Sequence, residues 1–319
     1  MVRALSVQSP LKTTSKSARW LALCLLVSVA VGREEGPRFR GPFLAGDMAE
    51  PVNREASGLA ASRRAEDLLW THNDSGGEPV LFALGTDGRL RGKVQIEGVK
   101  NVDWEDIDAA VVDGRAVLVV GDIGDNYAQY PQRVLHVVAE PDPATLAPDH
   151  ELSVRPEFSI HYLYEDGPRD AEGVAIDAGE HMIYILSKRE PQPRLYQLPW
   201  RAASADHPAV ARRVGIVPHL PQPTGWDNLI RDPHHAYRGW PTALDFSSDG
   251  RLALVLLYSR PLLFPRRPGE SWADALAREP VKLAAHALPQ AEGACFTRDG
   301  AALYVCSEVA TRLLRYNRP

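Results

Sequence analysis

DWEDIDAAVVDGRAVLVVGDIGDN, residues 103–126, is the most informative stretch of the chain. The apolar runs 107–112 and 116–120 flank Asp113-Gly114. Asp-Gly between two apolar runs is a strong signal for a tight hairpin turn. Because an antiparallel hairpin brings its two ends to one edge of the sheet, we expect its polar flanking side chains to gather at one rim: Glu105, Asp106, Asp108, Asp122, Asp125 and Asn126.

The same pattern recurs along the chain: a small or acidic residue, an apolar strand, a turn, a second apolar strand with a polar end, and a third strand. Copies begin at Ala56, Trp104, Ala171, Pro241 and Ala291. A fourth strand is expected after each of the first four copies, at residues 92–98, 157–164, 213–219 and 281–288. Radial repetition of four-stranded antiparallel units is typical of a β-propeller.

The sequence therefore predicts an all-β propeller of five blades. Six blades stay an alternative, because the gaps before Ala171 and Pro241 are long. The last copy ends after its third strand, and we expect the N-terminal stretch 40–48 to supply the missing outer strand and close the ring. Residues 218–240 match no strand pattern and predict a long loop, of the kind that is often functional.

Residues 1–32 resemble a signal peptide, followed by a single propeller domain over 33–319. A basic segment precedes the apolar run 20–31, which is shorter than the ~20 residues that a membrane span requires. Ala30-Val31-Gly32 offers small residues for cleavage. We expect an exported protein, periplasmic, at the cell surface or extracellular; an uncleaved anchor is the alternative.

Removal of residues 1–32 would take away four basic residues, leaving 32 basic against 41 acidic side chains and a net charge of −9. An acidic exported protein is a poor candidate for binding nucleic acid or anionic membrane surfaces. We expect a monomer with no nucleic-acid partner and no membrane contact beyond the signal segment. Cys295 and Cys306 then form either a cross-strand disulfide or a pair of buried free thiols.

Carboxylates recur at one position of the repeat. Alignment of the five copies places Ser57, Glu105, Glu172, Thr242 and Glu292 together on the first strand of each blade, which lines the propeller axis. Like charges brought close together repel, raise their pKa values or bind a cation. Ca²⁺ takes 6 to 8 oxygen ligands of this kind, so we expect a calcium site formed by Glu105, Asp122, Asp125, Asn126 and Glu172. The alternative is that these carboxylates accept backbone N–H groups and pair with Lys188 or Arg189.

His72 ends an apolar strand and is a candidate general base or ligand. The sequence contains no HExxH or paired-cysteine zinc pattern, no GxSxG nucleophile elbow and no GxxxxGK[ST] or GxGxxG nucleotide loop. We therefore expect no nucleotide cofactor. Asp87, Asp249 and Asp299 occupy Asp-Gly-type turns and need no site to explain them.

Short motifs add a family resemblance: HNDSGG (72–77), DWEDI (103–107), GDIGDN (121–126), DAEG (170–173), and QAEG followed by F-x-x-DG (290–300). Together they resemble a group of exported bacterial β-propeller proteins of undefined role. More distantly, the chain is similar to gluconolactonase-like and phytase-like esterase propellers. That resemblance implies a divalent cation on the axis, held by carboxylates and amides. The residues of this chain that would hold it are Glu105, Asp122, Asn126, Glu172 and Glu292. The chain departs from the gluconolactonase pattern in having Lys188 at the channel.

Two functions follow from these residues. The first is a scaffold that binds a small-molecule or protein ligand at the channel mouth and the 218–240 loop, where Trp226, His235, Tyr237 and Trp240 would make contacts. The second is a metal-dependent hydrolase of lactone, ester or phosphoester substrates. In that case His72 or Glu292 would act as the base and Lys188 would stabilise negative charge.

Overall fold

The stretch 103–126 forms the predicted hairpin, from β6 (Trp104–Val112) and β7 (Arg115–Asp122), in a computed structural model of the protein. The structure describes residues 37–48, 52, 55–221 and 239–319, which fall in a unit spanning residues 36–319. Both strands are longer than predicted, because the polar residues at their ends also adopt strand pairing. Glu105 and Asp106 thus lie within β6 rather than before it.

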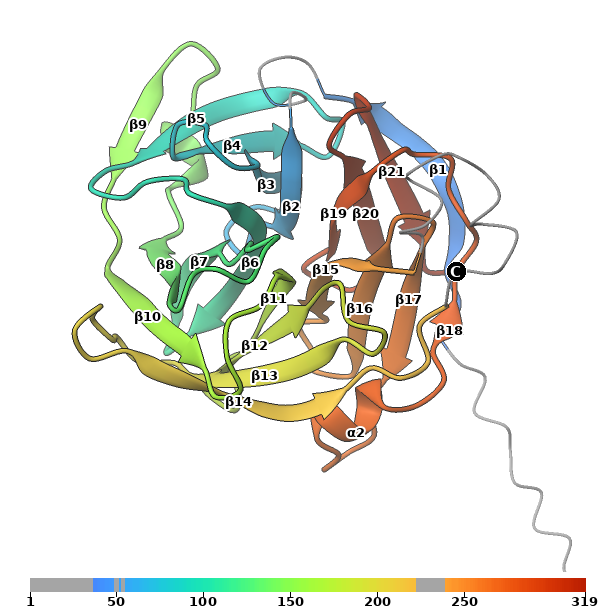
Figure 1. The fold of residues 1–319 in the computed structure, drawn as a ribbon. Helices are drawn as coiled ribbons and strands as arrows, with labels where there is room; N and C mark the ends of the chain where they lie inside the picture. The colour runs from blue at the N-terminus through green and yellow to red at the C-terminus, as the bar shows by residue number, and fades with distance from the viewer. Residues whose placement is uncertain (1–36, 49–51, 53–54, 222–238) are drawn as a thin grey trace, which may run out of the picture. The chain divides into compact units, whose positions relative to one another are not determined.

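Five blades surround a common axis, as predicted (Figure 1). Their inner strands are β2, β6, β11, β15 and β19, and each contacts the inner strands on both sides of it, so that the ring closes. The blades are β2 (Ala56–Ala61), β3 (Leu68–Asn73), β4 (Val80–Gly85) and β5 (Leu90–Ile96); β6, β7, β8 (Arg133–Ala139) and β10 (Phe158–Tyr164); β11 (Ala171–Asp177), β12 (Met182–Ser187), β13 (Arg194–Pro199) and β14 (Ala209–Ile216); β15 (Pro241–Phe246), β16 (Leu252–Leu257), β17 (Arg260–Pro265) and β18 (Val281–Lys282); and β19 (Ala291–Phe296), β20 (Ala302–Ser307), β21 (Arg312–Asn317) and β1 (Arg40–Asp47).

The ring closes through the N-terminal strand, as the sequence predicts. β1 pairs antiparallel with β21 and completes the last blade. The outer strands differ more from expectation: β14 begins four residues before the predicted start, and β18 has only two residues. Outside the blades, β9 (Glu151–Val154) pairs in parallel with β5, and β14 pairs in parallel with β10. The short helices η1 (Pro143–Thr145) and α2 (Trp272–Leu276) lie in connections.

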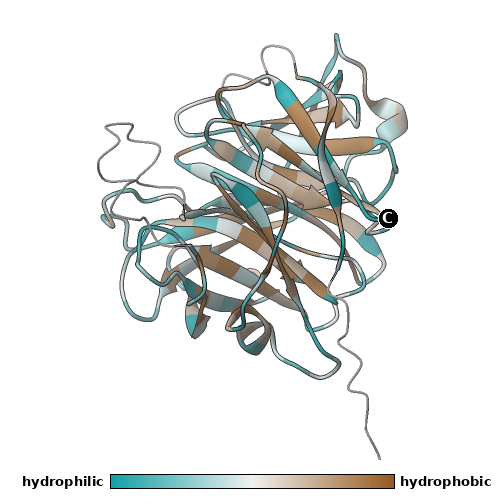
Figure 2. Cartoon of the chain, turned by 90° about the vertical axis from the view of Figure 1, so that its right-hand side faces the viewer, coloured by the Kyte–Doolittle hydropathy of each residue, from teal (hydrophilic) through white to brown (hydrophobic). Residues whose placement is uncertain are grey.

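Five apolar clusters fill the spaces between successive blades. The cluster between the first two blades, for example, contains Trp70 and Trp104, both fully buried. Figure 2 shows the same segregation, with apolar residues concentrated in the strands and polar residues in the turns. Because each cluster joins two blades, the hydrophobic free energy of the core depends on the ring being complete. Within the described ranges, no helix has the length and hydropathy of a membrane span.

Buried aspartates join the inner strands to one another. The Asp106 carboxylate accepts hydrogen bonds from the backbone N–H of Val174 (2.9 Å) on β11 and of Leu244 (3.2 Å) on β15. Similarly, Asp108 accepts from Ile176 N–H (2.7 Å) and Asp245 from Phe296 N–H (2.6 Å). The inner strands are sheet edges, whose N–H groups would otherwise be buried without a partner.

Cys295 and Cys306 are free thiols, both buried, which confirms the second of the two alternatives. They do not lie opposite each other in the hairpin of β19 and β20. Cys295 pairs with Tyr304, and Cys306 pairs with Gly293. The predicted long loop 218–240 falls mostly on residues 222–238, outside the described residues; of its contact candidates only Trp240 is described. The turn aspartates behave as expected: Asp299, for instance, accepts hydrogen bonds from the Thr297 hydroxyl and Ala301 N–H.

A pH series on Asp245→Asn tests the aspartate network. Burial raises the pKa of Asp245 to about 6, above its value in the unfolded chain. The folded state therefore binds more protons in this window, and the contribution of this carboxyl to stability falls as pH rises through about 6. Relative to wild type, Asp245→Asn should gain about 2–3 kcal/mol in unfolding free energy between about pH 4 and pH 7, measured by urea unfolding.

Asp299→Asn provides a control of opposite sign. The Thr297 hydrogen bond lowers the pKa of Asp299, so this carboxylate stabilises the fold at neutral pH and loses that effect as pH falls through its folded-state pKa. Asp299→Asn should therefore lose stability relative to wild type as pH rises. Parallel pH profiles for the two variants would contradict the assignment of Asp245.

Candidate axial carboxylate site

The repeat carboxylates Glu105, Glu172 and Glu292 occupy the second position of β6, β11 and β19. In each of these strands the pairing register shifts across the glutamate, as it does across Thr242 in β15. A bulge of this kind re-aims a side chain. All three glutamates are about 95% buried, with exposed fractions of 4–5%. The bulge thus explains why a charged residue recurs at this position of an otherwise apolar strand.

Glu105 is the centre of two groups of carboxylates. Its oxygens lie with those of Asp74 and Asp103 in a set whose members are all within 4.8 Å of one another, and with those of Asp170 and Glu172 in a second such set. We call these five residues the axial carboxylate cluster. Of them, the sequence predicts Glu105 and Glu172 as metal ligands but not Asp74, Asp103 and Asp170.

The sequence contains a pattern that points to two of the aspartates absent from the predicted ligand set. Asp103 and Asp170 each precede the repeat glutamate by two residues, in Asp103-x-Glu105 and Asp170-x-Glu172. Asp74 directly follows β3.

Burial and mutual repulsion raise the pKa values of Asp74, Asp103, Glu105 and Glu172. Burial, followed by the charges of Glu172 and Asp74, raises the pKa of Glu105 well above its ordinary value. Burial also raises the pKa of Asp103 to about 6. A raised pKa means that ionising these neighbouring buried carboxyl groups costs free energy. A bound cation reduces that cost.

Lys188 supplies one positive charge to the site. Its Nζ donates to Glu172 Oε1 (2.5 Å) and to the Tyr258 hydroxyl (3.1 Å). Burial by itself would lower the pKa of Lys188, but Glu172 and Glu292 raise it well above its ordinary value. Lys188 is therefore a fixed ammonium at neutral pH. One ammonium balances only part of the charge that the cluster can carry.

Three buried carboxylate oxygens accept no hydrogen bond from the described protein, and two of them belong to repeat glutamates: Glu172 Oε2 and Glu292 Oε2. Buried polar atoms without a protein partner are rare in folded proteins and require a water, ion or ligand. Burial raises the pKa of Glu292, while Lys188 and a hydrogen bond with Tyr258 oppose that shift. The donor set consists entirely of oxygens from Asp and Glu, which fits a hard cation such as Ca²⁺.

The other predicted ligands lie in supporting positions. The carboxylate of Asp125 accepts from Gln129 and Tyr130 N–H (both 2.8 Å), and its own N–H donates to Asp170 Oδ1 (2.8 Å). Asn126 accepts a hydrogen bond from Arg189, which also pairs with Asp170. The structure thus uses this loop to hold Asp170 and does not bring Asp125 or Asn126 into the axial carboxylate cluster.

Asp122 lies in a separate ion pair. Its carboxylate binds Arg133 at 2.5 Å and accepts from Val102 N–H (3.3 Å) and Asp103 N–H (3.2 Å). The charge on Asp122 is therefore already compensated, and it fixes the backbone of Asp103. The sequence could not show this, because the partner Arg133 is on another strand.

His72 is fully buried. Its Nδ1 lies 3.1 Å from the Asn73 carbonyl, and its ring packs edge-on against Trp104 with centroids 5.6 Å apart. Burial lowers the pKa of His72 to about 4, so the imidazole is neutral at pH 7. The structure does not bring it into the axial carboxylate cluster.

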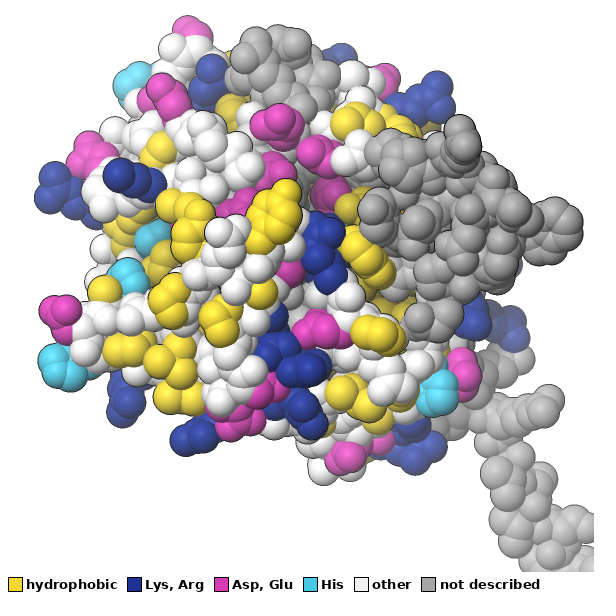
Figure 3. Space-filling model, in the orientation of Figure 1, with side chains coloured by type: hydrophobic (Ala, Val, Ile, Leu, Met, Phe, Trp, Pro, Cys, Tyr) yellow, Lys and Arg dark blue, Asp and Glu magenta, His cyan; other side chains and the backbone are white. Residues whose placement is uncertain are grey.

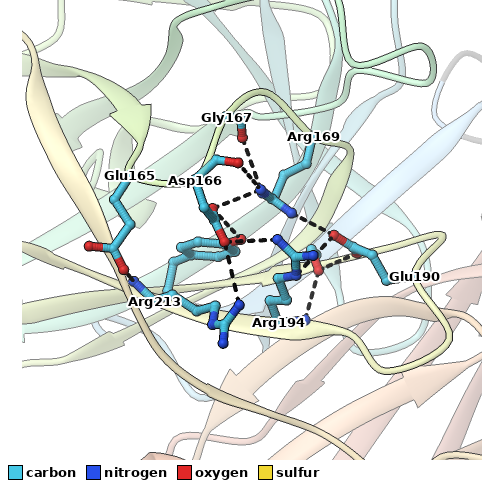
Figure 4. A network of polar contacts seen from close by, with 9 residues as sticks. Glu165, Asp166, Gly167, Arg169, Glu190, Arg194 and Arg213 are labelled. Atoms are coloured by element: carbon cyan, nitrogen blue, oxygen red, sulfur yellow. Dashed lines mark hydrogen bonds and ion pairs between the residues drawn. The ribbon is translucent and has the colours of Figure 1, made fainter.

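The loop before β11 is held by a buried arginine (Figure 4). Arg169 donates to Asp166 Oδ1 (2.7 Å), to the Asp166 and Gly167 carbonyls (both 3.0 Å) and to Glu190 Oε1 (2.7 Å). Asp166 in turn binds Arg194 at 2.8 Å. Because Asp170 and Glu172 follow directly, this network positions one side of the axial carboxylate cluster.

In Figure 3, acidic and basic side chains gather near the middle of the face in view.

No protein-family model matches the chain, and no curated protein matches it. Among solved structures, it is similar to a gluconolactonase from Xanthomonas campestris, with 12% identity, a TM-score of 0.45, and coverage of 88% of this chain and 90% of the other. It is also similar to the PQQ-bound form of aldose sugar dehydrogenase from Streptomyces coelicolor, with 11% identity, a TM-score of 0.43, and coverage of 88% and 99%. Matches this distant carry no argument about activity.

Arg169→Met tests the support of the site. It removes one partner from a buried network and should cost about 3 kcal/mol in unfolding free energy, since the carboxylates of Asp166 and Glu190 lose their main counter-charge. The control is Arg212→Met, which breaks the exposed Glu165 pair (3.2 Å) and should cost less than about 1 kcal/mol. Equal losses in urea unfolding would contradict the role assigned to Arg169.

Proposed function

We propose that the protein is an exported β-propeller that binds a divalent cation, Ca²⁺, at the axial carboxylate cluster. The ion then takes part in binding an oxygen-rich ligand at the channel mouth. The observation that carries this proposal is the convergence of four further carboxylates on Glu105, with oxygens of each set within 4.8 Å. Lys188 and Arg189 pair with Glu172 and Asp170 and so compensate only two of the five carboxylates.

Glu105, Asp74 and Asp103, or Glu105, Asp170 and Glu172, would hold the ion. Such an ion supplies attraction for anionic or carbonyl oxygens of a ligand. The chain's own contribution is positioning: the Arg169 network and the Asp125 loop hold Asp170, and Asp122 holds Asp103. Lys188 and Tyr258 lie beside the same carboxylates and offer an ammonium and a hydroxyl to a bound ligand.

Thermal and chemical unfolding with Ca²⁺ and with chelator tests the cation proposal. A ligand at 100 times its dissociation constant should stabilise the wild type by about 2.7 kcal/mol. Glu105→Gln should abolish this gain, because Glu105 belongs to both sets. The same variant should be more stable than wild type in chelator, since it removes a repulsive buried charge.

The matched control is Glu66→Gln, an exposed glutamate in the turn between β2 and β3. It should keep the full response to Ca²⁺. Glu172→Gln should lose most of the response to Ca²⁺. Comparison of Glu172→Gln with Glu105→Gln shows how much of the Ca²⁺-dependent stabilisation each of the two carboxylate sets contributes. A wild-type protein with the same stability in Ca²⁺ and in chelator would exclude the proposal.

A metal-dependent hydrolase of lactone, ester or phosphoester substrates is the second candidate. It is favoured by one observation, the unpartnered Glu292 Oε2, which belongs to a side chain that hydrogen-bonds Tyr258 and interacts with the charge of Lys188. In this scheme Glu292 takes a proton from the attacking water, and Lys188 stabilises the negative charge that develops. His72 is buried in the blade as a neutral imidazole, outside the axial carboxylate cluster, and has no role as the base in this scheme.

Glu292→Gln separates the two candidates. If the protein is a hydrolase, turnover of a lactone, aryl-ester or aryl-phosphate substrate should fall by about 10²–10⁴-fold, while the Ca²⁺-dependent stabilisation should persist. If wild-type protein loaded with Ca²⁺ turns over none of these substrates, or if Glu292→Gln retains full activity, the hydrolase scheme is excluded. The binding function would then stand alone.

A further inference from the structure

A cavity lies at the far ends of the inner strands, away from the axial carboxylate cluster. Its volume is about 510 Å³, within the range of small-molecule sites. Residues of all five blades line it, including Arg63 after β2, Val111 on β6, Ile176 on β11, Phe246 on β15 and Arg298 after β19. Neither function above uses this cavity.

The acidic side chains of the cavity are already engaged. Asp177 Oδ2 accepts from Arg266 (2.8 Å) and from the Trp272 indole N–H (2.8 Å). Asp249 Oδ1 accepts from the Ser247 hydroxyl (2.7 Å) and from Arg251 N–H (3.1 Å). Arg266 is thus neutralised by its own carboxylate, and Asp249 acts as a turn former.

Two arginines of the cavity have no such compensation. Arg63 Nε donates to the Ala109 carbonyl (2.7 Å) and its Nη1 donates to the Ser248 hydroxyl (2.8 Å). These two bonds hold the guanidinium in one orientation. Within the described ranges, neither Arg63 nor Arg298 forms an ion pair with a carboxylate. A fixed guanidinium with spare N–H groups is a typical recognition element for carboxylate and phosphate.

Two buried carboxyl groups, Asp108 and Asp245, act on Arg63 through space. Burial raises the pKa of Asp245 to about 6 and that of Asp108 well above its ordinary value. The pair therefore retains a proton to a higher pH than isolated aspartates. Asp108 and Asp245 therefore supply less negative charge to neutralise Arg63 than two fully ionised carboxylates would.

The repeat explains how the second arginine reaches the cavity. The fourth and fifth copies share the turn F-[ST]-x-D-G, as Phe246–Gly250 and 296–300. Ser248 and Arg298 occupy the same position of these turns. The turns of successive blades surround the axis, so one position of the motif presents a hydroxyl from one blade and a guanidinium from the next.

The remaining lining is apolar. Val111 is 50% exposed, an unusual exposure for a branched apolar side chain in a strand. Ile176 and Phe246 lie with it around the cavity. An apolar wall beside fixed polar groups is typical of small-molecule sites.

We propose that this cavity binds a small organic anion, with its carboxylate or phosphate group on Arg63, Arg298 and Ser248 and its apolar part against Val111, Ile176 and Phe246. The site is independent of the axial carboxylate cluster. Its ligand differs from that of the cation site in needing no metal.

Calorimetric titration of metal-free protein with three probes tests the proposal. Phenyl phosphate carries both features, inorganic phosphate carries the charge alone, and benzyl alcohol carries the ring alone. Phenyl phosphate should bind more tightly than inorganic phosphate, and benzyl alcohol should not bind. Arg63→Gln and Arg298→Gln should each weaken phenyl phosphate binding by about tenfold, as expected for loss of one charge-assisted contact.

Two controls complete the design. Arg201→Gln removes an exposed arginine elsewhere, and Glu105→Gln alters the axial carboxylate cluster; both should leave phenyl phosphate binding unchanged. Because Arg298 is exposed, its variant remains decisive even if Arg63→Gln fails to fold. Absence of phenyl phosphate binding at millimolar concentration, or equal binding by wild type and Arg298→Gln, would overturn the proposal.

Discussion

The hydrogen bonds that buried aspartates accept from backbone N–H groups of the inner strands are the contacts on which the ring depends. In each blade the inner strand is a sheet edge, and five such edges meet around the axis, where unpaired N–H groups cannot reach bulk water. Asp106 and Asp108 of one strand, and Asp245 of another, supply the missing acceptors. Burying these carboxyl groups costs free energy, which the hydrogen bonds to otherwise unpaired donors offset.

This arrangement makes the axis polar along its whole length, with opposite chemistry at its two ends. At one end, bulges direct Glu105 and Glu172 inward among further carboxylates. At the other end, Arg63 and Arg298 lie without ion-pair partners among the described residues. The aspartates that join the strands occupy the middle. The proposed cation site and the proposed anion site are therefore physically separate, and each can be altered without the other.

Lys188 shapes what the acidic end can do. Its ammonium binds one oxygen of Glu172 and leaves the other without a protein partner. It therefore lowers the cost of ionising the cluster without saturating it. A neutral residue at this position would leave stronger repulsion. Together with Arg189, which pairs with Asp170, Lys188 compensates two of the five carboxylates and leaves Glu105, Asp74 and Asp103 without a partner cation in the cluster, among the described residues.

The sequence by itself indicated the β-propeller with five blades favoured over six, its closure by the N-terminal strand, and one shared position on the inner strands for Glu105, Glu172 and Glu292, because strand periodicity, turn residues and repeats are local signals. Only the tertiary structure decided which carboxylates are available. Asp122 pairs with Arg133 and Asp125 caps its own loop, whereas Asp103 and Asp170 join the cluster. The burial of His72 and the register of the cysteine strands were likewise outside its reach. The physical reason is that charge compensation and burial depend on neighbours from other strands and blades, whereas strand and turn formation depend on residues nearby in the chain.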